Sequence, residues 1–419
     1  MMKVLFITNK LPFPDNDGRK NILMQYVRTI KKFDNNVEVL NAAFIDKEEY
    51  LEKKPNEISS VTKLDQPKII EKLFNLLMYT FLLKKWPLQV SMYYSRKTHR
   101  KVSNLVKEVK PDFIVYDMVR VAPYLVKGFS GQTIMNYDDL LSLRYSRQLE
   151  HIHYIPTILG GIASYFPMYI QKLISSKSLQ KSILKFESRL LNKYEKQVGW
   201  NFDKLVFTSP KEAKEFSEII NDRACLGIPM AYDTDKTTIR SKYQENQIVF
   251  VGKMDIPHNV AAVLYFCEKI WPIVKRANSS LEFHIIGKNP IKSVLELENK
   301  YEGVKVVGPV ADIEESIKNS AVFVAPLVFG TGIKTKVIEA LSYGVPVVTT
   351  SIGAEGIDFK NGHHMYVSDI EGEFANHIIS LTKSEKLNES FSINGKELVH
   401  HEFSKQSMNN KWLTLLGKS

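Results

Sequence analysis

Cysteine is scarce in this sequence, which contains only Cys225 and Cys267 among 419 residues. The two lie far apart and have no histidine at metal-ligand spacing, which excludes disulfide-rich and common zinc-binding classes and is typical of a reducing compartment. The first apolar stretch, at residues 4–8, is too short for a signal peptide and already has the pattern of a strand. We therefore expect a cytoplasmic protein.

Internal repeats, low-complexity segments and the common nucleic-acid-binding motifs are also absent from the sequence. The charge balance is nevertheless basic, because 57 Lys and Arg residues outnumber 46 Asp and Glu residues and give a net charge of +11. Such an excess attracts anions, including nucleotides, acidic lipids and nucleic acids. Without a nucleic-acid motif, nucleotides and lipids are the favoured partners and no nucleic acid is expected.

The N-terminal half alternates short apolar runs with helix-like patterns. Alternation of this kind predicts a parallel sheet covered by helices on both faces. Strands are expected at residues 4–8, 37–42, 112–117, 133–137 and 204–208, with a helix over about 19–32.

A second alternating series follows a polar stretch without periodicity at residues 233–246. Because 419 residues exceed one ordinary core, two domains are expected: an α/β fold of two Rossmann-like, doubly wound parallel sheets that face a central cleft. We place the first domain at residues 1–238, the second at 239–402, and a helix that returns to the first domain at 403–419. The second series predicts strands at 248–252, 283–287, 304–308, 321–325 and 345–349 and a helix over 259–275.

The most informative segment of the second half is FGTGIKTKVIEA at residues 329–340, which lies between two expected strands. Its glycines, Gly330 and Gly332, allow backbone N–H groups to approach a ligand, and the helix that follows directs its positive end toward that ligand. Lys334 and Lys336 would add positive charge, and Glu339 would accept hydrogen bonds from sugar hydroxyls. The set suits a diphosphate attached to a ribose, and the alternative is an ordinary strand–helix turn with solvated lysines.

Further motifs surround this loop in a fixed order: FVGKM at 250–254, PHN at 257–259, IIGKNP at 285–290, GPVAD at 308–312, APL at 325–327, EALSYGVPVV at 339–348 and GAEG at 353–356. Their order and spacing resemble family 4 (group 1) glycosyltransferases, which have the GT-B fold of two Rossmann-like domains. The N-terminal half agrees more loosely, through LPFP at 11–14, DGR at 17–19 and FTSPKEA at 207–213. The most similar subgroup builds bacterial surface polysaccharides.

The resemblance implies a retaining transfer of a sugar from a nucleotide-sugar donor to an acceptor hydroxyl. The conserved glutamate of the family corresponds to Glu339, which would hold the donor ribose. Its basic residue after the first C-domain strand corresponds to Lys253, which would face the diphosphate together with Lys336. These two lysines are the expected catalytic cations, because negative charge develops on the diphosphate as it leaves. The other residues expected to bind the donor in this half are Gly252, Gly330, Thr331, Gly332, Ile333 and Lys334.

Two positions depart from the family pattern. Thr331 stands where many relatives have a second glutamate that contacts donor sugar hydroxyls, so backbone amides of the loop would take over part of that work. His258 lies near a position where many relatives have a phosphate-binding lysine, and protonation beside a phosphate would make it a partner. No paired acidic motif for a metal occurs, so we expect no metal and no cofactor other than the nucleotide-sugar substrate.

Candidate residues in the N-terminal half come from strand ends and from the first glycine loop. Asp117 ends the strand at 113–116, where the family often has a group that touches the reacting sugar, and a helix N-cap is the alternative. Asp138 and Asp139 follow another strand and would meet the acceptor or cap a helix. Gly18 and Arg19 would reach a phosphate or the acceptor.

Two apolar stretches in the N-terminal half predict contact with a membrane. Residues 73–83 are apolar and precede Lys84, Lys85 and Trp86, and residues 155–174 are apolar but interrupted by proline and glycine, with a lysine-rich stretch after them. The first stretch is shorter than the roughly 20 residues that span a bilayer. Apolar surface beside lysines suits a helix in the headgroup plane of an anionic membrane. The alternative is that these helices complete the core of the domain.

We therefore predict a cytoplasmic, peripheral membrane glycosyltransferase of the hexosyltransferase type. It would transfer a sugar from a nucleotide-sugar to a saccharide acceptor, lipid-linked in our interpretation, during assembly of capsule, lipopolysaccharide O-antigen or exopolysaccharide. A sugar epimerase or phosphorylase of the same fold is one alternative. A non-catalytic scaffold that binds nucleotide-sugars is another, and Thr331 keeps it open.

Overall fold

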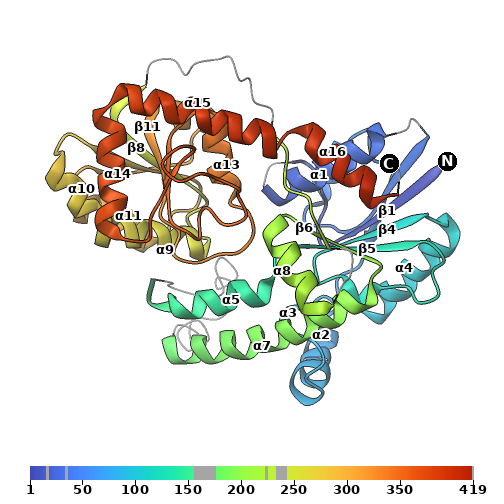
Figure 1. Ribbon diagram of the computed structural model, residues 1–419. Helices are drawn as coiled ribbons and strands as arrows, with labels where there is room; N and C mark the ends of the chain where they lie inside the picture. Colours follow the sequence, from blue (N-terminus) through green and yellow to red (C-terminus); the bar gives the residue numbers. More distant parts are fainter. Residues whose placement is uncertain (16–17, 34–35, 155–175, 222–224, 233–242, 418–419) are drawn as a thin grey trace. The chain divides into compact units, whose positions relative to one another are not determined.

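The computed structural model describes the whole chain except residues 16–17, 34–35, 155–175, 222–224, 233–242 and 418–419. It divides into two compact units (Figure 1). The first contains Met1–Leu143, Phe186–Ala231 and Lys405–Ser419, and the second contains Arg144–Lys185 and Tyr232–Ser404. The single boundary expected near residue 238 therefore differs from these interleaved units. A local polar stretch cannot show that a segment of the N-terminal half makes its contacts with the C-terminal half.

The first unit is built on a parallel sheet of seven strands within the described residues, in the order β3-β2-β1-β4-β5-β6-β7. Residues 4–7 of β1 are almost completely buried, as are residues 114–117 of β4. Parallel strands are covered on both faces, which is why their sequences are continuous apolar runs and could be predicted. The strands are β1 (Met2–Thr8), β2 (Val37–Phe44), β3 (Ser60–Leu64), β4 (Phe113–Asp117), β5 (Gln132–Asp138), β6 (Lys204–Phe207) and β7 (Cys225–Gly227).

The helices of the first unit include the last one of the chain. The ring of Trp412 on α16 packs against Tyr26 on α1 with ring centroids 5.0 Å apart, so the C-terminal helix belongs to this unit, as expected for the fold. Helices α5 (Leu141–Glu150) and α7 (Lys177–Asn201) extend from this unit into the second. The other main helices are α1 (Gly18–Lys32), α2 (Ile69–Asn75), the π-helix η2 (Leu76–Leu82), α3 (Leu88–Ser91), α4 (Arg96–Val109), α8 (Pro210–Ile220) and α16 (Lys405–Leu415). Among the described residues, 3-10 helices occur at η1 (Glu48–Lys53) and η3 (Ala122–Tyr124) in this unit and at η4 (Ile152–Tyr154) in the second.

Two strands of this sheet were not predicted. β3 and β7 form the two edges of the sheet, and β3 has the half-polar sequence SVTKL with mostly exposed or partly buried side chains. β7 has only three residues. Edge strands are covered less completely than central ones, so neither carries the apolar run by which the other strands could be recognised.

The second unit has a parallel sheet of six strands within the described residues, in the order β10-β9-β8-β11-β12-β13. Ile248, Phe250, Phe283, Val322 and Val324 are fully buried in its core. The strands are β8 (Gln244–Val251), β9 (Glu282–Ile286), β10 (Val304–Gly308), β11 (Ser320–Ala325), β12 (Val347–Thr349) and β13 (Tyr366–Val367).

The helix expected over residues 259–275 is present as a helical stretch with a π-helical turn. Pro272 lies at the start of α10 and has no N–H to donate, which accounts for a change in the hydrogen-bond pattern at this point. The helices of this unit are α9 (Pro257–Tyr265), the π-helix η6 (Phe266–Ile270), α10 (Trp271–Ala277), α11 (Lys292–Lys300), α12 (Ile313–Lys318), α13 (Thr335–Ser342), α14 (Glu371–Lys383) and α15 (Glu385–Glu402).

Both units are therefore Rossmann-like, with helices between parallel strands, as the sequence predicted. None of the helices in the described part of the chain is both long and apolar enough to cross a membrane.

Candidate functional site

The candidate site lies in the second unit, at the carboxyl ends of β8 and β11. These strands are parallel neighbours, so Gly252 and Lys253 after β8 lie at the same sheet edge as the glycine loop that connects β11 to α13. In sheets of this type, ligands bind at the carboxyl ends of the strands. The structure thus brings together two segments that the sequence predicted as parts of one site.

Lys336, in the first turn of α13, connects these two segments. Its Nζ donates a hydrogen bond to Oδ1 of Asn259 and lies 4.3 Å from the ring centroid of Phe250. Nδ2 of the same Asn259 donates to the backbone carbonyl of Lys253 at 2.9 Å. A Cβ atom on Gly252 would lie 2.7 Å from Nδ2 of Asn259 and 2.9 Å from Nζ of Lys336, so both side chains approach the backbone closely at this glycine. Gly252, Lys253 and Lys336 therefore form one cluster.

Lys336 loses its proton more readily in this site than an exposed lysine does. Burial lowers its pKa to about 7, the nearby Lys334 acts in the same direction, and Glu339 opposes both. Glu339 follows three residues later on the same helix, where side chains three apart are neighbours. Burial raises the pKa of Glu339, and Lys336 opposes that shift. An anion bound beside Lys336 would favour its charged form.

Lys334 folds the glycine loop upon itself. Its Nζ donates to the carbonyls of Thr331 at 3.0 Å and Gly332 at 2.6 Å, and lies 3.9 Å from a carboxylate oxygen of Glu355. Gly330 adopts φ +150°, a conformation that L side chains rarely adopt. The ammonium of Lys334, which we expected to bind the donor, thus donates two hydrogen bonds to carbonyls of its own loop and stabilises the loop conformation.

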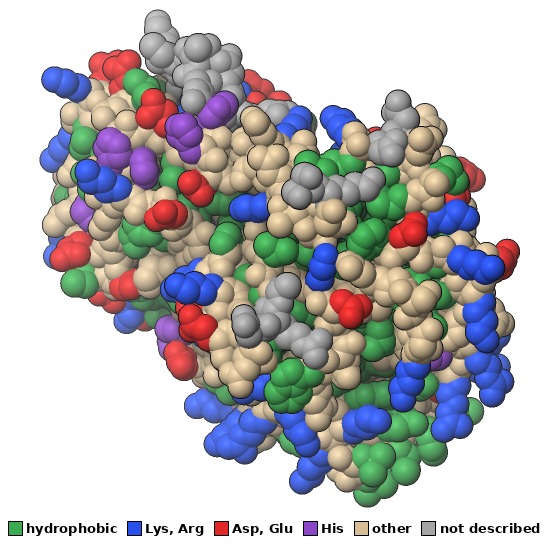
Figure 2. All heavy atoms as spheres, turned by 45° about the vertical axis from the view of Figure 1, so that its right-hand side comes forward, with side chains coloured by type: hydrophobic (Ala, Val, Ile, Leu, Met, Phe, Trp, Pro, Cys, Tyr) green, Lys and Arg blue, Asp and Glu red, His purple; other side chains and the backbone are tan. Residues whose placement is uncertain are grey.

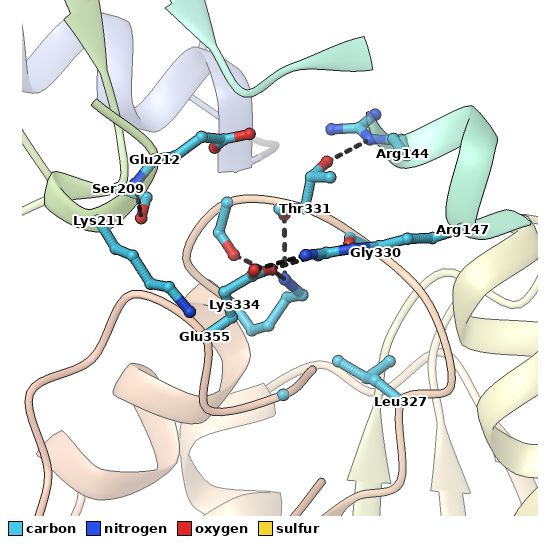
Figure 3. Close-up of polar contacts among 12 residues, drawn as sticks. Arg144, Arg147, Ser209, Lys211, Glu212, Leu327, Gly330, Thr331, Lys334 and Glu355 are labelled. Carbon is cyan, nitrogen blue, oxygen red and sulfur yellow. Dashed lines mark hydrogen bonds and ion pairs between the residues drawn. The ribbon is translucent and has the colours of Figure 1, made fainter. Parts of the chain in front are cut away.

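Two arginines from α5 also bind this loop. Arg147 forms two hydrogen bonds with the carboxylate of Glu355, at 2.6 and 2.8 Å, and a third with the carbonyl of Gly330 at 2.7 Å. Nε of Arg144 donates to the hydroxyl of Thr331 at 3.2 Å. Figure 3 shows both arginines extending from α5 toward the loop, with Lys334 on the same carboxylate as Arg147.

Arg144 and Arg147 were not predicted from the sequence. They lie three apart on one helix face, which was visible in the sequence. Their partners, however, are 187 and 208 residues away, and nothing local indicates that contact.

Thr331, which replaces a glutamate common in the family, is a buried hydroxyl that accepts a hydrogen bond from Arg144. His258 lies nearby and packs edge-on against Phe329, with ring centroids 6.4 Å apart. Burial lowers its pKa well below the ordinary value, and Lys336, Arg144 and Lys334 lower it further. This environment therefore favours the neutral form of His258.

The remaining predicted residue of this half, Ile333, is partly buried and packs on the core formed by α13 and its neighbouring strands. Taken together, the cluster places Lys334, Lys336, Arg144 and Arg147 around two carboxylates, Glu339 and Glu355. Burial is the main reason that the pKa values of His258 and Lys336 are lowered, and the neighbouring cations lower that of His258 further. A site of this kind is suited to bind an anion with more than one charge.

The predicted residues of the N-terminal half form a separate cluster in the first unit. Arg19, in the first turn of α1, forms an ion pair with Asp117 at the end of β4 and a second, at 2.8 Å, with Asp138 at the end of β5. Asn136 donates to the same oxygen of Asp117 at 3.1 Å. Gly18 is the residue that begins α1.

These ion pairs place two carboxylates on the single guanidinium of the first cluster. Burial raises the pKa of Asp117, while Arg19 opposes that shift. Burial would lower the pKa of Arg19, but Asp117 and Asp138 outweigh it and keep the guanidinium charged. Because two carboxylates already neutralise Arg19, it contributes little net charge toward a phosphate.

Asp139 lies in a different environment from Asp138. It is buried, and its charge contributes to a raised pKa of Glu195, for which burial is the main cause and gives a value of about 8. The first N–H groups at the start of α5 are satisfied by other carboxylates: Leu140 donates to Glu212 at 2.9 Å and Ser142 donates to Glu195 at 3.1 Å. These two glutamates therefore serve the helix end for which Asp138 and Asp139 were candidates.

In the described part of the chain, no group of three His, Cys, Asp or Glu side chains is placed to hold a metal ion.

Comparison with known proteins agrees with this geometry. A family model described as "Glycosyl transferases group 1" matches residues 245–384, which contain the candidate site. A Klebsiella pneumoniae protein described as an "Uncharacterized 44.6 kDa protein in cps region" is 23% identical over 417 residues, which are 96% of this chain and 95% of that protein.

Several solved structures share the fold of the whole chain. TarM, known from S. aureus, has a TM-score of 0.68 at 12% identity, with 99% of each chain covered. HepE of Anabaena, solved with UDP, has a TM-score of 0.64 at 12% identity, with 100% of each chain covered. The lipopolysaccharide outer core galactosyltransferase WaaB has a TM-score of 0.60 at 13% identity, also with 100% of each chain covered. The fold of this protein is thus GT-B, and together with the matched group 1 domain these findings support a glycosyltransferase.

Proposed function

We propose that this protein is a retaining glycosyltransferase of family 4, which moves a sugar from a nucleotide-sugar to a saccharide acceptor. One observation carries the proposal: Lys336, with its lowered pKa, lies beside Glu339 at the glycine loop and at the end of β8. A diphosphate would supply the negative charge that this lysine lacks. Glu339 would accept hydrogen bonds from the ribose of the same nucleotide.

The reaction breaks the bond between the anomeric carbon of the sugar and the diphosphate oxygen, and forms a bond between that carbon and the acceptor oxygen. The acceptor hydroxyl loses its proton, and the nucleoside diphosphate leaves with the bonding electron pair. Negative charge grows on the diphosphate during this step, so cations already placed there lower the barrier. Lys336 and Lys253 would act in this way, and Arg144 would approach the same anion through its position at Thr331.

A metal ion is not needed in this scheme, because the basic side chains would neutralise the diphosphate. UDP-sugars are the first donors to test, since HepE was solved with UDP, with UDP-glucose and with UDP and glucose. A variant of TarM was solved with UDP and alpha-GlcNAc-glycerol.

The acceptor would bind the first unit, where Asp117, Asp138 and Asn136 provide hydrogen-bonding groups at the carboxyl ends of β4 and β5. The relative encoded in a cps region and the lipopolysaccharide galactosyltransferase of the same fold favour assembly of a surface polysaccharide such as a capsule, O-antigen or exopolysaccharide. The acceptor would then be lipid-linked and the enzyme a peripheral protein on the cytoplasmic face of the membrane.

A scaffold that binds nucleotide-sugars without turnover is the second candidate, and Thr331 is the residue that favours it. The hydroxyl of Thr331 is held by Arg144 and cannot replace the charge of a glutamate. Turnover separates the two functions.

The experiment combines thermal unfolding with product release. The intact protein is heated with a panel of nucleoside diphosphates and nucleotide-sugars, and a ligand at 100 times its dissociation constant should stabilise it by about 2.7 kcal/mol. Glu339→Gln should remove most of this stabilisation. Lys292→Met is the matched control, because Lys292 is highly exposed on α11, and it should respond like the wild type.

Release of the nucleoside diphosphate from a stabilising donor, with acceptor present, supports the transferase. Stabilisation without release from any donor and acceptor favours the scaffold. A wild-type protein that no nucleotide stabilises would overturn both.

A further inference from the structure

The helical segment formed by α2 and η2, residues 69–82, has its polar side chains inside and its apolar side chains outside. Asn75 and Thr80 are its fully buried residues. Nδ2 of Asn75 donates to the carbonyls of Ser91 at 3.1 Å and Tyr94 at 2.8 Å, and the hydroxyls of Thr80 and Ser91 are 2.7 Å apart. The segment is thus attached to the first unit by these hydrogen bonds and by the ring of Tyr79, which packs against Tyr94 with ring centroids 6.5 Å apart.

The π-helical turn explains how both polar residues face inward. In a π-helix the hydrogen bonds join residues five apart, as in the bond from Leu83 N–H to the Met78 carbonyl at 2.9 Å. Residues five apart, such as Asn75 and Thr80, then lie one above the other, whereas in an α-helix they would point to different sides. The π turn therefore leaves the apolar residues to face solvent.

The outer face of this segment is a continuous apolar surface. The exposed fraction is 83% for Ile70, 61% for Leu73 and 56% for Leu77. Phe81 and Leu82, at the end of the segment, are also more than half exposed. Figure 2 shows hydrophobic side chains gathered at the lower edge of the molecule beside Lys and Arg side chains, at the height where Figure 1 places α2. The exposed members of this surface are Ile69, Ile70, Leu73, Phe74, Leu77, Phe81, Leu82 and Leu83.

An exposed cluster of this kind marks an interaction surface. Other exposed large apolar residues in the described part of the chain, such as Trp200, Ile219 and Ile370, are scattered over different elements. The alternative in which residues 73–83 complete the core does not fit the burial, because most of the large apolar side chains in this stretch are exposed.

Basic residues surround the apolar surface. Lys68 and Lys72 lie at its start, Lys84 and Lys85 at its end, and Glu71 is the only acidic residue between residues 66 and 86. Phe81 stacks on Phe186 of α7, with ring centroids 5.9 Å apart, which brings α7 beside the segment. Arg189 and Lys193 follow Phe186 by about one and two turns of α7, and both are exposed.

We propose that residues 68–85 dock this protein on an anionic phospholipid bilayer, with α2 and η2 lying in the headgroup plane. Apolar side chains would enter the boundary of the acyl chains and the lysines would contact lipid phosphates. At roughly 1.5 Å per residue the segment is about 20 Å long, which suits a position along the surface. A second copy of the chain is a poorer occupant, because a symmetric contact would set the same basic residues against each other.

This inference deepens the proposed function, on which it rests for the lipid-linked acceptor, but docking itself needs no donor or turnover. The intact protein is sedimented with vesicles of phosphatidylcholine alone or mixed with phosphatidylglycerol. We expect binding to the mixed vesicles, weakened by salt because surface charges are screened, and at least about tenfold weaker binding to phosphatidylcholine.

Two variants and one control test the surface. The triple variant Ile70→Ser, Leu73→Ser, Leu77→Ser should lose vesicle binding by about tenfold or more, because it removes three inserted side chains. The double variant Lys84→Gln, Lys85→Gln keeps the apolar face and should weaken binding to the mixed vesicles by about tenfold or more. The pair Ile219→Ser, Ile370→Ser removes apolar residues with 49% and 58% exposure elsewhere and should bind like the wild type.

A cooperative thermal unfolding transition like that of the wild type shows that each variant is folded, and if the triple variant fails this check the lysine variant decides. Unchanged vesicle binding by a folded variant overturns the proposal. So does a wild type that ignores mixed vesicles, or a wild-type dimer in light scattering that the triple variant converts to monomers. Vesicle binding by a protein that no nucleotide stabilises would refute the proposed function and leave the docking surface in place.

Discussion

The two parallel sheets carry opposite kinds of charge chemistry at their carboxyl ends. In the first unit, Arg19 is paired with Asp117 and Asp138, so its positive charge is fully matched within the protein. In the second unit, burial lowers the pKa of Lys336 to about 7 and keeps His258 neutral, and the neighbouring basic residues lower the pKa of His258 further. The first cluster is complete without a ligand, and the second gains from an anion.

The two clusters are therefore suited to different ligands. A cluster whose cation is already paired offers hydrogen bonds to neutral groups such as sugar hydroxyls without attracting phosphate. A cluster with excess positive charge attracts a diphosphate and favours the charged state that develops as the bond breaks. The variants and measurements below each change or test one of these two clusters.

The largest effect is expected for Asp117→Asn in the cluster that Asp117 forms with Arg19 and Asp138. Removing one partner of a buried ion pair costs about 3–5 kcal/mol, and the lower end applies here because Asp138 still pairs with Arg19. Urea unfolding followed by fluorescence measures the loss. The control is Asp15→Asn, because Asp15 and Arg28 form an exposed pair and its loss should change stability by less than about 1 kcal/mol.

Nucleotide affinity of the folded Asp117→Asn variant should equal that of the wild type, because the anion site belongs to the other unit. Loss of nucleotide binding in the folded variant would end the distinction between the two clusters.

The second prediction concerns the pH dependence of donor binding. In the free site the pKa of Lys336 is about 7, and a bound diphosphate raises it, so the complex holds more protons than the free protein. Affinity for a nucleotide-sugar should therefore be highest below pH 7 and fall by up to about tenfold per pH unit above it. Isothermal titration calorimetry between about pH 6 and pH 9 measures this trend.

Lys336→Met is the control for that measurement. Without a titrating amine, the variant should bind weakly and with little dependence on pH. A wild-type profile that is equally flat would show that Lys336 does not gain a proton on binding.

The smallest effect is expected for Thr331→Val, which keeps the shape of the side chain and removes the hydroxyl that accepts from Arg144. One lost hydrogen bond costs about 0.5–1.5 kcal/mol, or roughly a 2- to 13-fold weaker donor affinity. Thr382→Val is the matched control, because its hydroxyl donates to carbonyls within α14 and should not affect donor binding. Equal affinities for both variants would remove Thr331 from the donor site.

Much of the fold could be predicted because central parallel strands are covered on both faces. Residues 247–251 of β8 and all residues of β11 are buried, and their apolar runs gave a clear pattern. The glycine loop, Lys336 and Glu339 were predicted for the same reason, since they follow such a strand at short distance. Interactions between distant segments had no such signal, and the contact of Arg144 with Thr331 is the main example.

Two further features depended on information that a linear pattern does not contain. Arg19 was a candidate for a phosphate partner, but its charge is matched by two carboxylates from strands that lie far away in sequence. The apolar residues at 73–83 were recognised, but the inward position of Asn75 and Thr80 depends on a π-helical turn. The second predicted membrane stretch, residues 155–174, lies outside the described residues.

The polar interior of the α2–η2 segment also has a practical consequence for expression and storage. A helical segment attached by Asn75 and Thr80 remains folded in water and continues to expose its apolar face when no lipid is present. When more protein is produced than the membrane can bind, the excess should therefore be prone to aggregate and should precipitate as it is concentrated. Mild detergent or lipid nanodiscs should keep such preparations monodisperse, whereas serine at Ile70, Leu73 and Leu77 should give a better-behaved sample for crystallisation.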